Sequence, residues 1–113
     1  MVEPNAPMKR VLWWLLAGSR GGENRGRIIL ALRDRPSNAH QLSEHLGLDY
    51  KTVRHHLKVL QDNGVLVPSG PEQYGAVYLL TPAMEQAASL FDEIWAKVGA
   101  KDKPPADQGG SKP

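Results

Sequence analysis

The stretch NAHQLSEHLGLDYKTVRHHLKVLQDNG, residues 38–64, decides the fold of this 113-residue chain. Asn38 followed three residues later by Gln41 is typical of a capping box at the start of a helix. Gly47 suits the left-handed position that ends a helix, and Asp49 can cap the next one. The pattern therefore predicts two helices, the second over residues 50–63, joined by a turn of about three residues.

The second of these helices separates an apolar side from a basic side. At about 100° per residue, Val53, Leu57 and Leu60 fall together and are expected to face the core. The opposite side carries Lys51, Thr52, Arg54, His55 and Lys58. Two helices joined in this way form a helix-turn-helix, whose second helix can enter the major groove of DNA. Arg and Lys donate there to guanine or phosphate, and a Thr methyl can meet the thymine methyl.

The flanking segments complete the predicted architecture. Upstream, residues 9–17 predict a short helix that is apolar on every side, and residues 25–35 predict a second helix capped by Asn24. Downstream, residues 65–67 and 76–80 predict a β-hairpin whose loop is 68–75. Thr81 and Pro82 begin a last helix whose inner side is Met84, Ala87, Ala88, Phe91, Ile94, Trp95 and Val98. The order is four helices, a hairpin wing and a helix, which is a mostly α winged helix-turn-helix.

One domain accounts for the folded part of the chain. Residues 8–99 have the apolar patterning of a folded domain. Residues 1–7 and the tail 100–113 lack large apolar side chains at the spacing that folding needs, so we expect both to be disordered.

Composition excludes several classes of function. The chain has no Cys, which removes disulfide scaffolds, thiolate zinc sites and cysteine nucleophiles and suits a reducing cytoplasm. His40 and His45 are five residues apart and His55 and His56 are adjacent, so neither pair has the spacing of metal ligands on one helix face. No hydrolase or metalloprotease motif is present. We expect no metal, no cofactor and no enzymatic activity.

Charge is divided unevenly along the chain. Residues 9–58 contain ten Lys or Arg against four Asp or Glu, whereas residues 59–113 contain four against seven. A basic first half favours a polyanionic partner. Further contacts with DNA are predicted for helix starts and for a basic cluster: Tyr50, Asn38, His40, Gln41, Arg20 and Arg25. His56 lies beside the buried side of its helix and is expected to be packed.

The stretch from Arg27 to Leu80 resembles winged-helix regulators of the ArsR type. The sequence LDYKTVRHHL, residues 48–57, is most similar to small archaeal members of this type. The segment 12–18 is similar to the same members. The resemblance implies a regulator that binds double-stranded DNA as a homodimer, with a two-fold interface between first and last helices. It places Val11, Trp13, Trp14, Phe91, Ile94 and Trp95 at or near that interface. The family's cysteine and histidine metal sites are missing from this sequence.

Two alternatives use the same fold without specific DNA binding. The predicted wing loop, residues 69–75, has no Lys or Arg, so it should add little DNA affinity and favours a protein-interaction module. A membrane-proximal output domain held by Trp13 and Trp14 is the other alternative, although the seven-residue apolar run is too short to span a membrane. The sequence leaves open whether these two Trp side chains face a partner subunit or the core.

Overall fold

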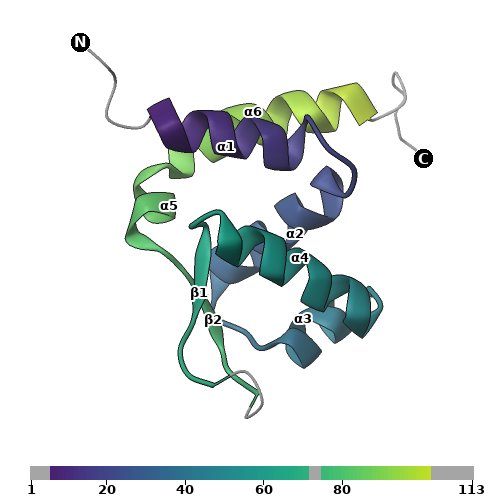
Figure 1. The fold of residues 1–113 in the computed structure, drawn as a ribbon. Coiled ribbons are helices and arrows are strands. Elements are labelled where there is room, and N and C mark those ends of the chain that lie inside the picture. The colour runs from purple at the N-terminus through teal and green to yellow at the C-terminus, as the bar shows by residue number, and fades with distance from the viewer. Residues whose placement is uncertain (1–5, 72–74, 103–113) are drawn as a thin grey trace.

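The computed structural model describes residues 6–71 and 75–102. Its helices and strands are α1 (Ala6–Leu16), α2 (Gly22–Asp34), α3 (Ala39–Leu46), α4 (Tyr50–Asp62), β1 (Leu66–Pro68), β2 (Tyr78–Leu80), α5 (Pro82–Gln86) and α6 (Ala88–Asp102) (Figure 1). Helices precede a two-stranded hairpin and a helical segment follows it. This order confirms the predicted winged-helix arrangement.

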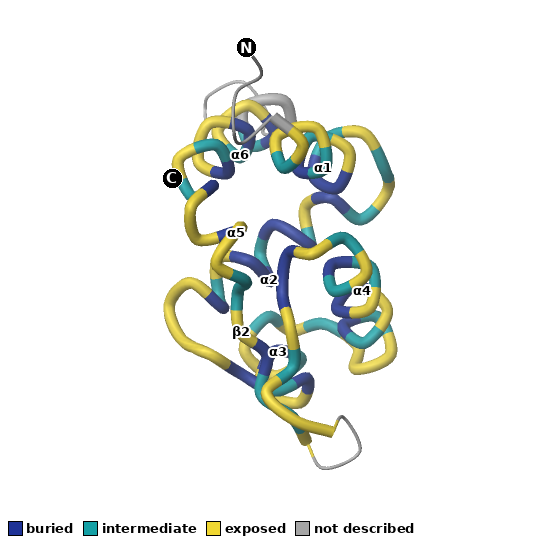
Figure 2. The backbone as a smooth tube through the Cα atoms, turned by 60° about the vertical axis from the view of Figure 1, so that its left-hand side comes forward, coloured by how far each residue is buried: buried dark blue, intermediate teal, exposed yellow. Residues whose placement is uncertain are grey.

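Helix α2 lies at the centre of the molecule. On one side it packs against α1, which runs beside α6, and on the other it contacts α3, α4 and β2 (Figure 1). Its inner residues Ile28 and Ile29 are fully buried, and the burial-coloured trace shows dark blue stretches in this helix (Figure 2). The core thus connects a layer made of α1 and α6 with the helix-turn-helix and its wing.

The starts and ends of three helices differ from the prediction. Helix α1 already includes Ala6 and Pro7, and α6 continues through residues 100–102, so both helices extend into the segments that were predicted to be disordered. Helix α2 begins at Gly22, three residues before the predicted start, and its cap is Gly21 at φ 81°, not Asn24. A Cβ on Gly22 would lie 2.1 Å from the Leu16 carbonyl oxygen, so a glycine lets α2 start directly against α1. The other predicted disordered residues, 1–5 and 103–113, lie outside the described residues.

The predicted last helix is two helices that meet at Ala87. Thr81 caps α5 by accepting a hydrogen bond from the Met84 N–H at 3.2 Å, with Pro82 in the first turn. At Ala87 the backbone leaves the helical region (φ −96°, ψ 15°) and its N–H bonds to the Met84 carbonyl. Met84, Ala87 and Phe91 are all fully buried, so the bend keeps the inner sides of both helices on the core.

In the hairpin, β1 lies one residue later than predicted and β2 begins two residues later than predicted. Leu66 pairs with Leu80, Val67 with Leu79 and Pro68 with Tyr78 in an antiparallel ladder. Tyr78 also donates its N–H to the Ser37 carbonyl at 2.8 Å, which ties the wing to the segment that precedes α3. Residues 72–74 of the predicted wing loop lie outside the described residues.

Candidate nucleic-acid interface

Local hydrogen bonds hold α3 and α4 as the sequence predicts. Asn38 and Gln41 form a capping box with two 2.8 Å hydrogen bonds, and Gly47 ends α3 at φ 67°. The Asp49 carboxylate accepts the N–H groups of Lys51 and Thr52 at 3.0 and 3.3 Å. These caps satisfy backbone groups that a helix end leaves without partners, and so they fix the turn between the helices.

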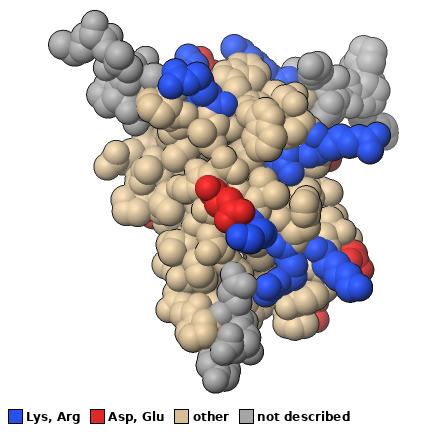
Figure 3. Space-filling model, in the orientation of Figure 1, with Lys and Arg blue, Asp and Glu red and all other residues tan. Residues whose placement is uncertain are grey.

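Helix α4 presents its basic side outward. Val53, Leu57 and Leu60 are at most 1% exposed, in agreement with the predicted inner side. On the other side Lys51, His55 and Lys58 are exposed, while Thr52 and Arg54 are half-buried. Figure 3 shows Lys and Arg side chains gathered over this helix. Lys58 forms an exposed ion pair with Asp62 at 2.9 Å, a contact that costs little to exchange for a phosphate because both groups remain hydrated.

The starts of α3 and α4 meet in an aromatic stack. The rings of His40 and Tyr50 lie 4.4 Å apart at 20°, and both side chains are exposed. The capping box uses the side-chain oxygens of Asn38 and Gln41, so their amide NH2 groups are the donors that remain for an outside partner. The structure thereby brings the predicted contacts of α3 next to those of α4.

The structure corrects the prediction for Arg25 and confirms the one for His56. Arg25 is 3% exposed, and its guanidinium bonds to the carbonyls of Leu15 and Arg20 and to the Ser19 hydroxyl. A side chain used in this way does not reach DNA, whereas the side chain of Arg20 is exposed. His56 is 6% exposed and packed, with its Nδ1 3.3 Å from Arg25 Nη1.

The surroundings of His56 lower its pKa. Burial, followed by the charge of Arg25 and then that of His55, holds the pKa of His56 below its usual value.

The sequence did contain a signal for the burial of Arg25. This residue is three, four and seven residues before Ile28, Ile29 and Leu32, and therefore lies on the inner side of α2.

The predicted dimer residues divide into a buried and an exposed group. Phe91 and Ile94 are at most 1% exposed, so the core of the protomer covers them and they cannot form the surface of an interface. Val11, Trp13 and Trp95 are half-buried, and Trp95 stacks on Phe91 with the ring centroids 5.8 Å apart.

The two Trp side chains of α1 have different surroundings. Trp14 is 52% exposed, whereas Trp13 packs against the core with Lys97 Nζ 5.5 Å from its ring centroid. Trp13 thus contacts the core of its own protomer, and its half-buried ring keeps a part that a partner subunit can cover. The structure also leaves Trp14 as the main apolar group that α1 offers to solvent.

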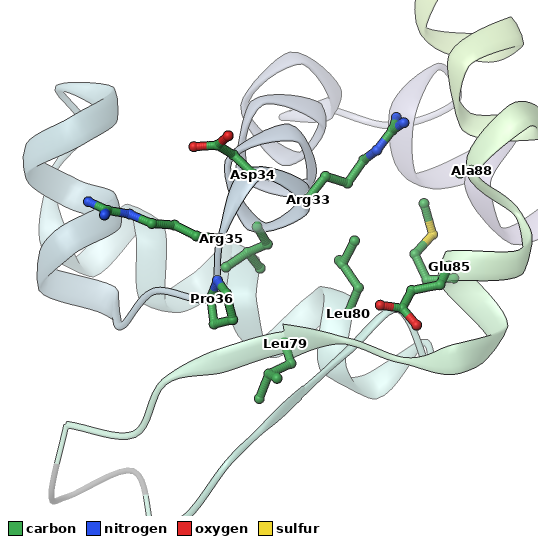
Figure 4. A pocket seen from close by; sticks show the side chains of 10 residues that line it. Arg33, Asp34, Arg35, Pro36, Leu79, Leu80, Glu85 and Ala88 are labelled. Atoms are coloured by element: carbon green, nitrogen blue, oxygen red, sulfur yellow. The ribbon is translucent and has the colours of Figure 1, made fainter.

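A surface pocket of about 360 Å³ lies between the end of α2, β2 and α5, away from the predicted DNA contacts. Leu32, Leu80 and Met84 contribute apolar side chains to it, and Figure 4 shows the Glu85 carboxylate directed toward β2 while Arg35 points away.

Within residues 6–71 and 75–102, His, Asp and Glu side chains do not form a group of three or more that could hold a metal ion. No helix of this part is long and apolar enough to cross a membrane.

Comparisons with known proteins identify the central segment and the fold. Residues 22–66 match the family model described as bacterial regulatory protein, arsR family, which confirms the expected resemblance over α2, α3, α4 and the start of β1. No curated protein matches the chain.

Solved structures of transcriptional regulators share the fold. A MarR transcriptional regulator from Methanosarcina mazei Go1 matches with a TM-score of 0.63 at 15% identity, over 88% of this chain and 76% of that one. The reduced form of the regulator YodB from B. subtilis matches with a TM-score of 0.62 at 23% identity, over 97% of this chain and 100% of that one. A probable transcriptional regulator from Pseudomonas aeruginosa matches with a TM-score of 0.59 at 17% identity, over 92% of this chain and 83% of that one.

Proposed function

Because residues 22–66 carry an ArsR-family helix-turn-helix within a winged-helix fold, we propose that this protein is a homodimeric transcriptional regulator that binds double-stranded DNA sequence-specifically. The observation that carries the proposal is the polarity of α4, whose apolar side is buried while its basic side faces solvent. The protein acts by binding and not by catalysis, and a regulator of this kind works in the cytoplasm with the chromosome.

The residues of the proposed interface divide into those that contact bases and those that contact the DNA backbone or the edge of the groove. Lys51, Arg54 and His55 would reach base edges in the major groove, where a good bidentate contact discriminates by about 1–3 kcal/mol. The remaining groups would bind phosphates or the edge of the groove: Thr52, Lys58, Tyr50, Asn38, His40, Gln41 and Arg20. Since phosphate contacts release counterions, affinity should fall steeply as salt rises.

The proposed dimer uses the layer made of α1 and α6. Trp14 is the largest exposed apolar side chain there, and a two-fold axis would bury the same surface on both subunits. Val11, Trp13 and Trp95, which are half-buried in the protomer, would line the edge of this surface. Two symmetric copies of α4 predict a pseudo-palindromic site with half-sites about one helical turn apart.

The test is fluorescence anisotropy with a mixed-sequence duplex at low and at physiological salt. Lys51→Ala/Arg54→Ala should weaken binding at least roughly 30-fold, the sum of two contacts at the low end of their range, and should reduce the salt dependence. Lys9→Ala/Arg10→Ala removes the same charge from an exposed part of α1 and is the matched control. Equal losses in both variants, or no binding by the wild type at low salt, would refute the proposal.

A docking module for a protein partner is the second candidate, on one specific observation. Val67 and Leu79 are paired across the hairpin, and both are exposed, at 44% and 38%. Apolar side chains in this position suit a partner that covers the wing. Such binding would survive Lys51→Ala/Arg54→Ala and would be lost in Val67→Ser/Leu79→Ser.

A further inference from the structure

Arg25 is a buried cation whose partners within the described chain are all uncharged. It donates to the carbonyls of Leu15 and Arg20 at 2.9 and 2.7 Å and to the Ser19 hydroxyl, and its Nη1 lies 3.3 Å from His56 Nδ1. The first three groups belong to the end of α1 and the loop that leads to α2, whereas His56 belongs to α4. A single guanidinium therefore connects this loop with the proposed recognition helix.

The contact determines the protonation state of His56. A guanidinium has no acceptor and stays protonated, so Nη1 donates and His56 Nδ1 must carry a lone pair. His56 is then the neutral tautomer, with its proton on Nε2. The loop also packs closely on this ring, because a Cβ on Gly21 would lie 2.6 Å from His56 Cε1.

We propose that Arg25 and His56 are a positioning pair that locks α4 to the α1–α2 loop, and that protonation of His56 opens the lock. The consequence for DNA binding rests on the proposed function of α4, whereas the lock itself does not. It would make the regulator sensitive to acidification through a residue that touches no DNA.

Among the described residues, the charges that act on His56 are those of Arg25 and His55, and both oppose a positive charge on it. Helix α2 presents the permanently charged Arg25, and its own helix presents His55, whose ring centroid is 5.4 Å away. The loop presents the backbone of Gly21. A second charge 3.3 Å from the guanidinium would therefore break the hydrogen bond and push the ring out of its site.

The sign of the pH effect follows from the direction of the shift. The pKa of His56 is lowered in the folded protein from its ordinary value of 6.5, so the unfolded chain binds the proton more readily. The stabilisation is fully present above pH 6.5 and is lost as the pH falls below it. The unfolding equilibrium constant should rise by up to about tenfold for each pH unit below that value, until the folded protein also takes up the proton.

The experiment combines an NMR titration of the four His side chains of the wild type with urea unfolding between about pH 5 and 8. His56 should titrate below its ordinary pKa of 6.5, and stability should fall below that pH. His56→Asn keeps an acceptor near the Nδ1 position but does not titrate, so it should remove most of this pH dependence. His45→Asn, at an exposed position of α3, is the matched control and should keep it.

Three results would overturn the inference. They are a His56 that titrates at its ordinary pKa, a His56→Asn variant with the wild-type pH profile, and a His45→Asn variant that loses that profile. The NMR titration needs no variant, so poor folding of His56→Asn does not remove the test.

DNA anisotropy at the same pH values separates the lock from the proposed function. Affinity for the mixed-sequence duplex should fall on acidification more steeply in the wild type than in His56→Asn. A wild type that binds no duplex at pH 7.5 and low salt refutes the proposed function, while the stability profile still decides the lock. A wild type that binds DNA with the same pH dependence as His56→Asn refutes the effect of the lock on α4.

Discussion

Gly26→Ala should destabilise the protein, although alanine is the better helix former. Gly26 lies inside α2 and faces Trp95 of α6, and a Cβ there would lie 2.0, 2.5 and 2.6 Å from three atoms of the indole. The change gains about 1 kcal/mol of helix propensity. Overpacking typically costs about 1–3 kcal/mol, and the indole cannot retreat freely because it stacks on the fully buried Phe91. At the upper end of that range the net loss is about 2 kcal/mol.

Urea unfolding followed by circular dichroism measures this loss, and a double-mutant cycle identifies its cause. In a Trp95→Leu background the same Gly26→Ala change should become stabilising, because the clash is gone and the propensity remains. Gly99→Ala is the matched control, since a Cβ on this α6 glycine meets nothing within 4 Å, and it should stabilise by about 0.5–1 kcal/mol. A Gly26→Ala change that has the same effect with and without Trp95 would refute the packing of Trp95 inside the protomer.

Three further substitutions test the cap, the core and the proposed interface. Asn38→Ala removes one half of the capping box with Gln41 and should cost about 1 kcal/mol in urea unfolding; no loss would mean that the cap does not hold α3. Phe91→Ala should cost about 3–5 kcal/mol because the ring is fully buried, and a loss below about 1 kcal/mol would contradict its place in the core. Trp14→Ala should weaken self-association in sedimentation equilibrium by at least about tenfold, unlike Val67→Ala on the wing; equal effects would contradict an interface at α1.

Local signals made the helix-turn-helix predictable. The caps at Asn38 and Asp49, the left-handed glycine at Gly47 and the apolar spacing of α4 are each decided by residues a few positions apart, and all four agree with the structure. Such features need no knowledge of the rest of the chain.

Features that depend on distant contacts were predicted less well. The early start of α2 depends on the close approach of Gly22 to α1, and the bend at Ala87 depends on keeping two short helices on one core. Sequence also cannot tell whether an apolar stripe is covered by its own chain or by a second copy. Phe91 and Ile94, predicted at or near an interface, are buried in the core of the protomer.

One turn of α2 explains how the two halves of the molecule are joined. Successive residues of a helix point about 100° apart, so Arg25, Gly26 and Arg27 face three different neighbours. Arg25 bonds to α4, Gly26 lies against α6 and Arg27 donates to a carbonyl at the end of α3 at 2.8 Å. In the proposed dimer, a shift of α6 would thus reach α3 and α4 together through this turn. Substitutions here should change stability and DNA affinity together, whereas Lys51→Ala, on the exposed side of α4, should change affinity alone.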